Sequence, residues 1–157
     1  MRKRKDSKLV VRGFLRGQLV DSETGKVVGD SGWVQNKLMN DGLTDLARLV
    51  GAVAGSYAIG YACMATQTDA PDMSQTHVIG PINSFKALNL STSGTCTLTA
   101  TASFGSASLT AAATVGGAGL FKTDSASSML CMQTFATSAW ATNQDFNLTY
   151  QIRFATA

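Results

Sequence analysis

Few side chains in this 157-residue chain could carry out catalysis. His77 is the only histidine and Glu23 the only glutamate. A serine hydrolase needs a histidine base beside its nucleophile, and the sequence lacks the G-x-S-x-G turn that would support such an arrangement. Glycoside hydrolysis needs paired carboxylates, but Asp69 and Asp72 lie in a polar stretch typical of a loop. We therefore predict no catalytic residue and no enzymatic activity.

Metal and cofactor sites are not predicted either. Cys63, Cys96 and Cys131 form no C-x-x-C pair, and one histidine cannot complete a zinc site with them. Their odd number argues against a complete disulfide framework, and we expect all three to be buried thiols. Residues 116–119 (Gly-Gly-Ala-Gly) lack the Lys-Ser/Thr of a phosphate-binding loop, so we interpret them as a bend between strands. Asp69 and Asp72 have too few oxygen ligands around them for calcium.

Basic residues at the start of the chain have the clearest chemical character. Residues 1–16 hold seven of the thirteen basic residues and one of the ten acidic ones, so this segment carries +6 and the remainder −3. We interpret residues 1–16 as a basic N-terminal arm, partly a first strand, and residues 17–157 as one domain. The arm could contact phosphate or an acidic surface, or be a solubilising tail. Its first aromatic residue is Phe14, so stacking on nucleic acid is not favoured. The expected contact residues are Arg2, Lys3, Arg4, Lys5, Lys8, Arg12 and Arg16.

The first third of the chain predicts a hairpin followed by a helix. Residues 9–20 are typical of a strand, residues 21–25 (Asp-Ser-Glu-Thr-Gly) of a turn, and residues 26–28 of the return strand. A helix should begin at Asn40 or Asp41, whose side chains can cap it, and end near Gly55. Its expected apolar face, which would cover one end of a sandwich, consists of Leu43, Leu46, Ala47, Val50 and Val53.

The rest of the chain predicts further strands. Residues 57–66 form a short apolar run, and residues 67–81 a polar loop. Apolar and polar residues alternate over 95–104, again over 107–115 as an expected return strand, and over 146–154. Residues 129–135 are apolar on both faces, which indicates a central strand. We predict an all-β fold of seven to nine strands, a jelly-roll-like β-sandwich first and an immunoglobulin-like topology second.

The distribution of charge favours assembly with other subunits. Charged residues make up only 15% of the chain, and between residues 87 and 147 they are limited to Lys122, Asp124 and Asp145. Strand faces with so little charge would associate edge to edge unless other subunits cover them. No apolar run is long enough to span a membrane. Arg12 and Arg16 interrupt the apolar core of any signal peptide, so we expect cytoplasmic synthesis without processing.

Two segments resemble structural proteins of tailed-bacteriophage virions. That group shows an Asp-x-x-Thr-Gly-like turn, followed by Asn-x-x-x-Asn-x-Gly-Leu and a short helix. In this chain residues 21–25 resemble the turn, residues 36–43 resemble the second motif, and a helix is expected around Leu46 and Ala47. The group also shows Ala-Gly-Leu-Phe, a polar gap and a strand ending in Thr-Phe, as residues 118–121 and 129–135 do here. The last strand, residues 146–154, also fits, whereas residues 67–94 are not covered.

The resemblance implies a virion structural role without catalysis. We expect a subunit, as a homotrimer, that decorates and stabilises a capsid shell by binding the major capsid protein or other virion proteins. Its location would be the virion, after synthesis in the host cytoplasm. A tail, neck or fibre subunit is the alternative within the same class. A carbohydrate-binding host-attachment module is a further alternative, in which Trp33 or Trp140 would supply an exposed aromatic platform.

Overall fold

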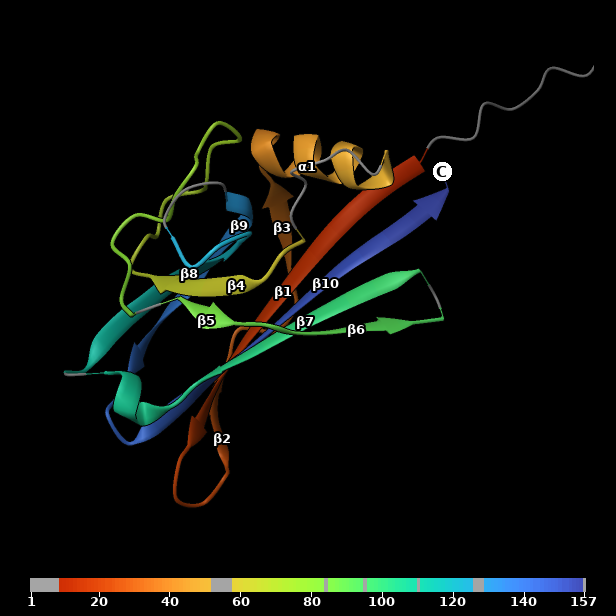
Figure 1. Ribbon diagram of the computed structural model, residues 1–157. Coiled ribbons are helices and arrows are strands. Elements are labelled where there is room, and N and C mark those ends of the chain that lie inside the picture. Colours follow the sequence, from red (N-terminus) through yellow and green to blue (C-terminus); the bar gives the residue numbers. More distant parts are fainter. Residues whose placement is uncertain are drawn as a thin grey trace, which may run out of the picture.

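The computed structural model describes residues 9–51, 58–83, 85–94, 96–109, 111–125 and 129–156. Within these residues the predicted all-β class with one short helix is confirmed (Figure 1), and the strands number ten rather than seven to nine. In chain order the elements are β1 (Leu9–Asp21), β2 (Val27–Asp30), β3 (Val34–Leu38), α1 (Asn40–Val50), β4 (Tyr61–Ala65), β5 (Lys86–Ala87), β6 (Asn89–Ser93), β7 (Thr97–Phe104), a short 3-10 helix (Ser106–Ser108), β8 (Ala113–Phe121), β9 (Met129–Trp140) and β10 (Gln144–Thr156).

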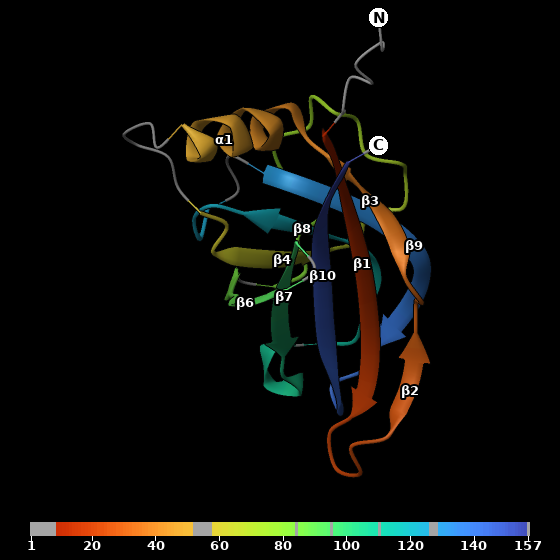
Figure 2. The ribbon, with the colours of Figure 1, turned by 90° about the vertical axis from the view of Figure 1, so that its right-hand side faces the viewer.

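The strands form one antiparallel sheet that is nearly closed. Its hydrogen-bonded order is β5-β4-β8-β9-β3-β1-β10-β7-β6, and β2 pairs with β1 beside this path. The two ends of the path, β5 and β6, are separated in sequence only by Leu88. One short segment therefore pairs with β4 at its start and with β7 at its end. Figure 2 shows the antiparallel strands β1, β10 and β7 aligned along one axis, with β4 and β8 crossing them.

Apolar side chains from both parts of the sheet share the main core. The ring of Trp140 packs against those of Phe104 and Phe146, with centroids 6.3 and 5.8 Å away. The hydroxyl of Tyr150 on β10 donates a hydrogen bond of 2.8 Å to the Ala118 carbonyl on β8. Because β8 and β10 are not neighbours in the sheet, this bond joins two distant parts of the path. All four side chains are buried.

A second apolar cluster lies on the other face of β4, β8 and β9. Alternate residues of β4 enter the two clusters, Ala62 and Met64 the main core and Cys63 and Ala65 the second one. The polar loop predicted at residues 67–81 is confirmed, and its Val78 packs into the second cluster. This explains why residues 61–65 lack polar alternation, since both faces of the strand are covered.

Several predicted strands are confirmed with their faces. β1 pairs with β10 along its whole length, from Leu9 opposite Thr156 to Asp21 opposite Gln144. The turn after β1 forms as expected, because the Asp21 carboxylate accepts hydrogen bonds from the amide and hydroxyl of Thr24, and Gly25 has a φ of 67°. In β7, Ala100, Ala102 and Phe104 are buried on one face, as the alternation predicts.

Two predictions about the residues after β7 are wrong. Residues 107–115 do not return beside β7, because β10 and β6 already occupy both of its edges. The chain instead crosses to β8, which pairs with β4 and β9. Residues 116–119 are not a bend but part of buried β8. Glycine is needed there for close packing, since a Cβ at Gly116 would lie 2.5 Å from the Gln67 carbonyl oxygen.

The helix begins where predicted, but its capping, end and contact face differ from the prediction. The N-cap is Met39, without a side-chain cap, and the helix ends at Val50, before Gly55, which lies outside the described residues. On the predicted apolar face Leu43, Ala47 and Val50 are exposed and Leu46 is half-buried, whereas Val53 lies outside the described residues. The helix instead packs on β9 through Gly42, where a Cβ would lie 2.1 Å from the Leu130 carbonyl oxygen.

An ion pair also holds α1 in this orientation. Asp45 is buried, and its carboxylate lies 2.9 Å from Lys122 Nζ just beyond β8. A charged residue on the buried face and apolar residues on the exposed face reverse the usual amphipathic arrangement.

Candidate functional site

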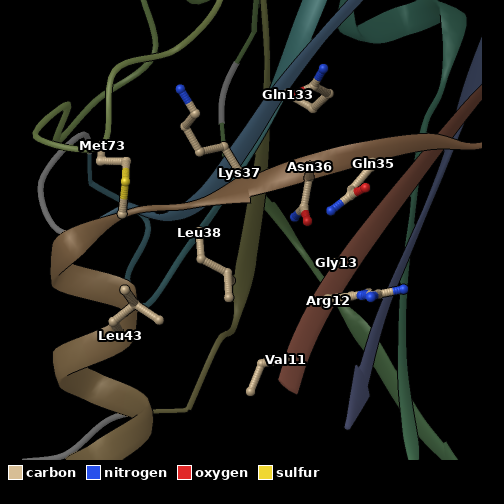
Figure 3. A pocket seen from close by; sticks show the side chains of 10 residues that line it. All are labelled: Val11, Arg12, Gly13, Gln35, Asn36, Lys37, Leu38, Leu43, Met73 and Gln133. Atoms are coloured by element: carbon tan, nitrogen blue, oxygen red, sulfur yellow. The ribbon is translucent and has the colours of Figure 1, made fainter. Parts of the chain in front are cut away.

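A groove opens where β3 leaves β1, beside α1 (Figure 3). The start of β3 pairs with residues 13–15 of β1, whereas Lys37 and Leu38 pair with β9. Residues 9–12 of β1 therefore pair with β10 on one side and have no strand partner on the other among the described residues. The groove has a volume of about 520 Å³ and is lined by Val11, Arg12, Gly13, Gln35, Asn36, Lys37, Leu38, Leu43, Met73 and Gln133.

Apolar side chains form the helix side of this groove. Leu43 of α1 is 42% exposed, and Met73 from the loop after β4 is equally exposed. Figure 3 shows Leu43, Leu38 and Val11 on the side of the groove where α1 lies. Further along the same helix, Val50 is 90% exposed. An exposed apolar helix face beside a free strand edge is the type of surface that binds other protein segments.

A buried amide lies on the β3 side of the groove. Asn36 is only 7% exposed, and neither polar atom of its amide has a hydrogen bond of ordinary geometry among the described residues. It lies over Gly13, its partner on β1, where a Cβ would lie 1.7 Å from Asn36 Oδ1. Glycine at position 13 therefore makes room for the amide. A buried amide without well-formed hydrogen bonds is costly, and the polar groups that approach this one are the Cys131 thiol and the Tyr150 hydroxyl.

The ionisable groups near Asn36 are held in their neutral form. Burial raises the pKa of the Cys131 thiol and the pKa of the Tyr150 hydroxyl well above their usual ranges, and the neighbouring Asn36 amide offsets only part of this effect. A thiol with a raised pKa is a poor nucleophile. Neither group lines the groove, which offers apolar, amide and basic side chains.

Two of the seven predicted contact residues lie within the described residues, and both are on β1. Arg12 lines the groove, and in Figure 3 its side chain points away from α1. Arg16 pairs with Asp30 of β2, which lowers the pKa of that carboxyl to about 2. Arg2, Lys3, Arg4, Lys5 and Lys8 lie outside the described residues. β1 continues through residues 16 and 17 without a break, so residues 9–16 belong to the sheet.

Other residues singled out in the sequence lie apart from the groove. His77 lies in the loop after β4, with Nδ1 3.3 Å from the Thr76 hydroxyl. Trp140 is buried, and its Nε1 donates a hydrogen bond to the Gln144 carbonyl, so it cannot form an exposed platform. Trp33 is 45% exposed. Within the described ranges no three histidine, cysteine or acidic residues are grouped so that they could hold a metal ion.

The prediction that all three cysteines are buried is wrong for one of them. Cys63 and Cys131 are buried, but Cys96 is exposed in the turn between β6 and β7, with a φ of 53°. The burial of Asn36 could not be predicted from the sequence, because an asparagine in an expected strand gives no sign that its amide is buried. Its spacing from Gly13 becomes meaningful only once the two residues are opposite each other.

Comparisons with known proteins give no match for this chain, whether with protein-family models, curated proteins or solved structures. No helix in the described part of the chain is long and apolar enough to cross a membrane.

Proposed function

We propose that this chain is a non-enzymatic structural subunit of a virion, which decorates and stabilises a capsid shell by binding its neighbours. The observation that carries the proposal is the groove, where the free edge of β1 lies beside the exposed Leu43 of α1. In this proposal the partner is the major capsid protein or another virion protein, and the subunit acts as a homotrimer. The jelly-roll-like sandwich expected from the sequence belongs to the same proposal, supported by two crossing parts of the sheet that share one core.

The groove suggests how such a subunit would bind. An extended segment of a neighbour can pair with the backbone of residues 9–12 and place apolar side chains against Leu43 and Met73. Each bound subunit then stabilises the assembled shell by mass action, because it binds the shell and not the separated capsid proteins.

Two alternatives use the same molecule differently. A tail, neck or fibre subunit would use the same groove but assemble into rings or tubes. A carbohydrate-binding module is favoured by one observation, the exposed ring of Trp33. Glycan binding that is lost in Trp33→Ala would support this second alternative, and absence of binding on a broad glycan array would count against it.

The proposal is tested on virus particles. Peptides of this chain should be found in density-purified particles in a fixed ratio to the major capsid protein, by quantitative mass spectrometry. Particles stripped of the protein should bind recombinant wild-type chain again. Leu43→Glu places a charge in the apolar part of the groove and should weaken rebinding by at least about tenfold, that is by about 1.4 kcal/mol.

A matched variant separates this site from the rest of the helix. Thr44→Glu adds the same charge at the next, exposed position of α1. It should rebind as the wild type does. Absence of the chain from purified particles would refute the virion role, and equal rebinding by Leu43→Glu would remove the groove from it.

A further inference from the structure

The outer face of β1, β10, β7 and β6 carries polar side chains in cross-strand rows. These four strands lie side by side (Figures 1 and 2). Pairing places the residues opposite one another in three rows, which are Arg12–Arg153–Thr97–Ser93, Phe14–Gln151–Thr99–Ser91 and Arg16–Thr149–Thr101–Asn89. The rows contain three arginines and no carboxylate. Within the described part of the chain, the one ion pair on this face joins Arg16 to Asp30 of β2, and Arg12 and Arg153 have no compensating carboxylate.

Arg12 and Arg153 are directly opposite each other on neighbouring strands. Directly opposite residues have Cβ atoms about 5 Å apart, and like charges at this distance destabilise the pair. Among the described residues neither side chain has an acidic partner. Arg153 is held in place by neutral groups, since its guanidinium lies 4.7 Å from the centre of the Phe14 ring and donates a hydrogen bond to Gln151. The two guanidinium groups together can hold one anion between them.

A shallow hollow beside this pair supplies further polar groups. It has a volume of about 440 Å³ and is lined by Ser93, Thr97, Thr99, Gln151, Arg153, Phe154 and Ala155. Hydroxyl and amide groups of this kind contact phosphate and sugar oxygens in complexes with nucleic acids. The hollow therefore extends from the arginine pair across β7 toward β6.

We propose that this face binds the phosphate backbone of a nucleic acid, with Arg12 and Arg153 holding one phosphate between them. A phosphate has enough oxygens to accept hydrogen bonds from both guanidinium groups. A protein partner would instead need apolar or aromatic anchors at the centre of the interface. In these rows the only such residue is Phe14, and the Arg153 guanidinium covers its ring.

The sequence before β1 fits the same partner. Five of the eight residues that precede Leu9 are lysine or arginine, and Leu9 begins the strand that carries Arg12. Basic residues that neutralise phosphates give an affinity that falls steeply as salt rises and depends little on base sequence. This binding would use the outer face of the sheet, and it shares Arg12 with the groove beside α1.

The test measures binding of the full chain to a labelled DNA of about 30 nucleotides, single-stranded or duplex, by fluorescence anisotropy at about 50 and about 200 mM salt. The double variant Arg12→Gln/Arg153→Gln should bind at least about tenfold more weakly. The slope of its log affinity against log salt concentration should be smaller in magnitude by about one. Lys26→Gln/Lys86→Gln removes the same charge from two exposed positions outside the rows and should change the affinity by less than about threefold.

Three results would overturn the proposal. They are no binding of either DNA by the wild type, an equal loss of affinity in both double variants, and binding to polyglutamate instead of DNA with the same dependence on Arg12 and Arg153.

A second measurement needs no polymer. Phosphate should raise the Tm of the wild type more than chloride at equal ionic strength does, and this difference should vanish in Arg12→Gln/Arg153→Gln. The same difference in both proteins would count against the arginine pair.

Discussion

At the scale of single residues, burial separates three cysteines that look alike in the sequence. Each lies in an apolar or alternating stretch, and this pattern correctly predicts that Cys63 and Cys131 are buried. It fails for Cys96, which lies at the beginning of the alternating run, in the turn that leads into β7, and has a positive φ. Alternation reports on faces within a strand and carries no information about where the strand begins.

These environments predict how the thiols react with a thiol-specific reagent at about pH 8, where an ordinary thiol with a pKa near 8.5 is partly ionised. Burial raises the pKa of Cys63 to about 11 and raises that of Cys131 as well, so both remain protonated as well as covered. We expect one thiol per chain to react rapidly in the folded protein and all three after unfolding. Absorbance of the released reagent group measures the number.

The Cys96→Ser variant is the control for this assignment. It should retain the two slow thiols and lose the rapid one. Rapid labelling in Cys96→Ser, or more than one rapid thiol in the wild type, would contradict the burial of Cys63 and Cys131.

At the scale of elements, the sequence predicts α1 but not its orientation. Helical spacing correctly places Leu43, Leu46, Ala47 and Val50 on one face. The face that packs is instead decided by Gly42 and by the pairing of Asp45 with Lys122. Periodicity identifies an apolar stripe, but it does not show whether the stripe lies against the sheet or faces a partner.

Because α1 lies on β9 in this orientation, replacing its glycine by alanine should lower the stability of the protein rather than raise it. Gly→Ala inside a helix usually stabilises a protein by roughly 0.5–1 kcal/mol. Gly42→Ala should instead destabilise this one by about 1–3 kcal/mol, because the new Cβ would overlap the Leu130 carbonyl and force the helix away from β9. Urea unfolding followed by circular dichroism measures the change.

Arg48→Ala provides the comparison within the same helix, since Arg48 is exposed in its last turn. Its stability should stay within about 0.5 kcal/mol of the wild type. A stabilising effect of Gly42→Ala would show that α1 does not lie on β9 through this glycine.

At the scale of the whole molecule, the faces of most strands could be predicted and their neighbours could not. Alternation defines the buried side of β7 and β10 from local residues alone. The crossing from β7 to β8 depends on which edges are already occupied, and this is a property of the complete sheet. The candidate groove was missed for the same reason, since it exists only because β3 changes partners from β1 to β9.

Among the described strands, β6 forms an exposed edge of the sheet that bears on assembly. All five residues of β6 are exposed, and they pair with β7 on one side only. The strand contains no charged residue, although charges, and lysine especially, are what usually protect such edges. An uncharged edge of this length is suited to pairing with another copy of the chain.

The last prediction concerns the oligomeric state, which light scattering measures as the native mass. We expect a discrete trimer, three times the 16.4 kDa chain, at low and at moderate salt. Leu90→Lys places a charge on the β6 edge, where Leu90 is 44% exposed, and should shift the protein toward monomer. Val50→Lys adds the same charge at the end of α1 and should leave the mass unchanged. A wild-type monomer, or open-ended growth into tubes, would contradict the trimeric decoration subunit and favour the tail or neck alternative. Open-ended growth is incompatible with a closed trimer, because such a trimer leaves no edge for further subunits.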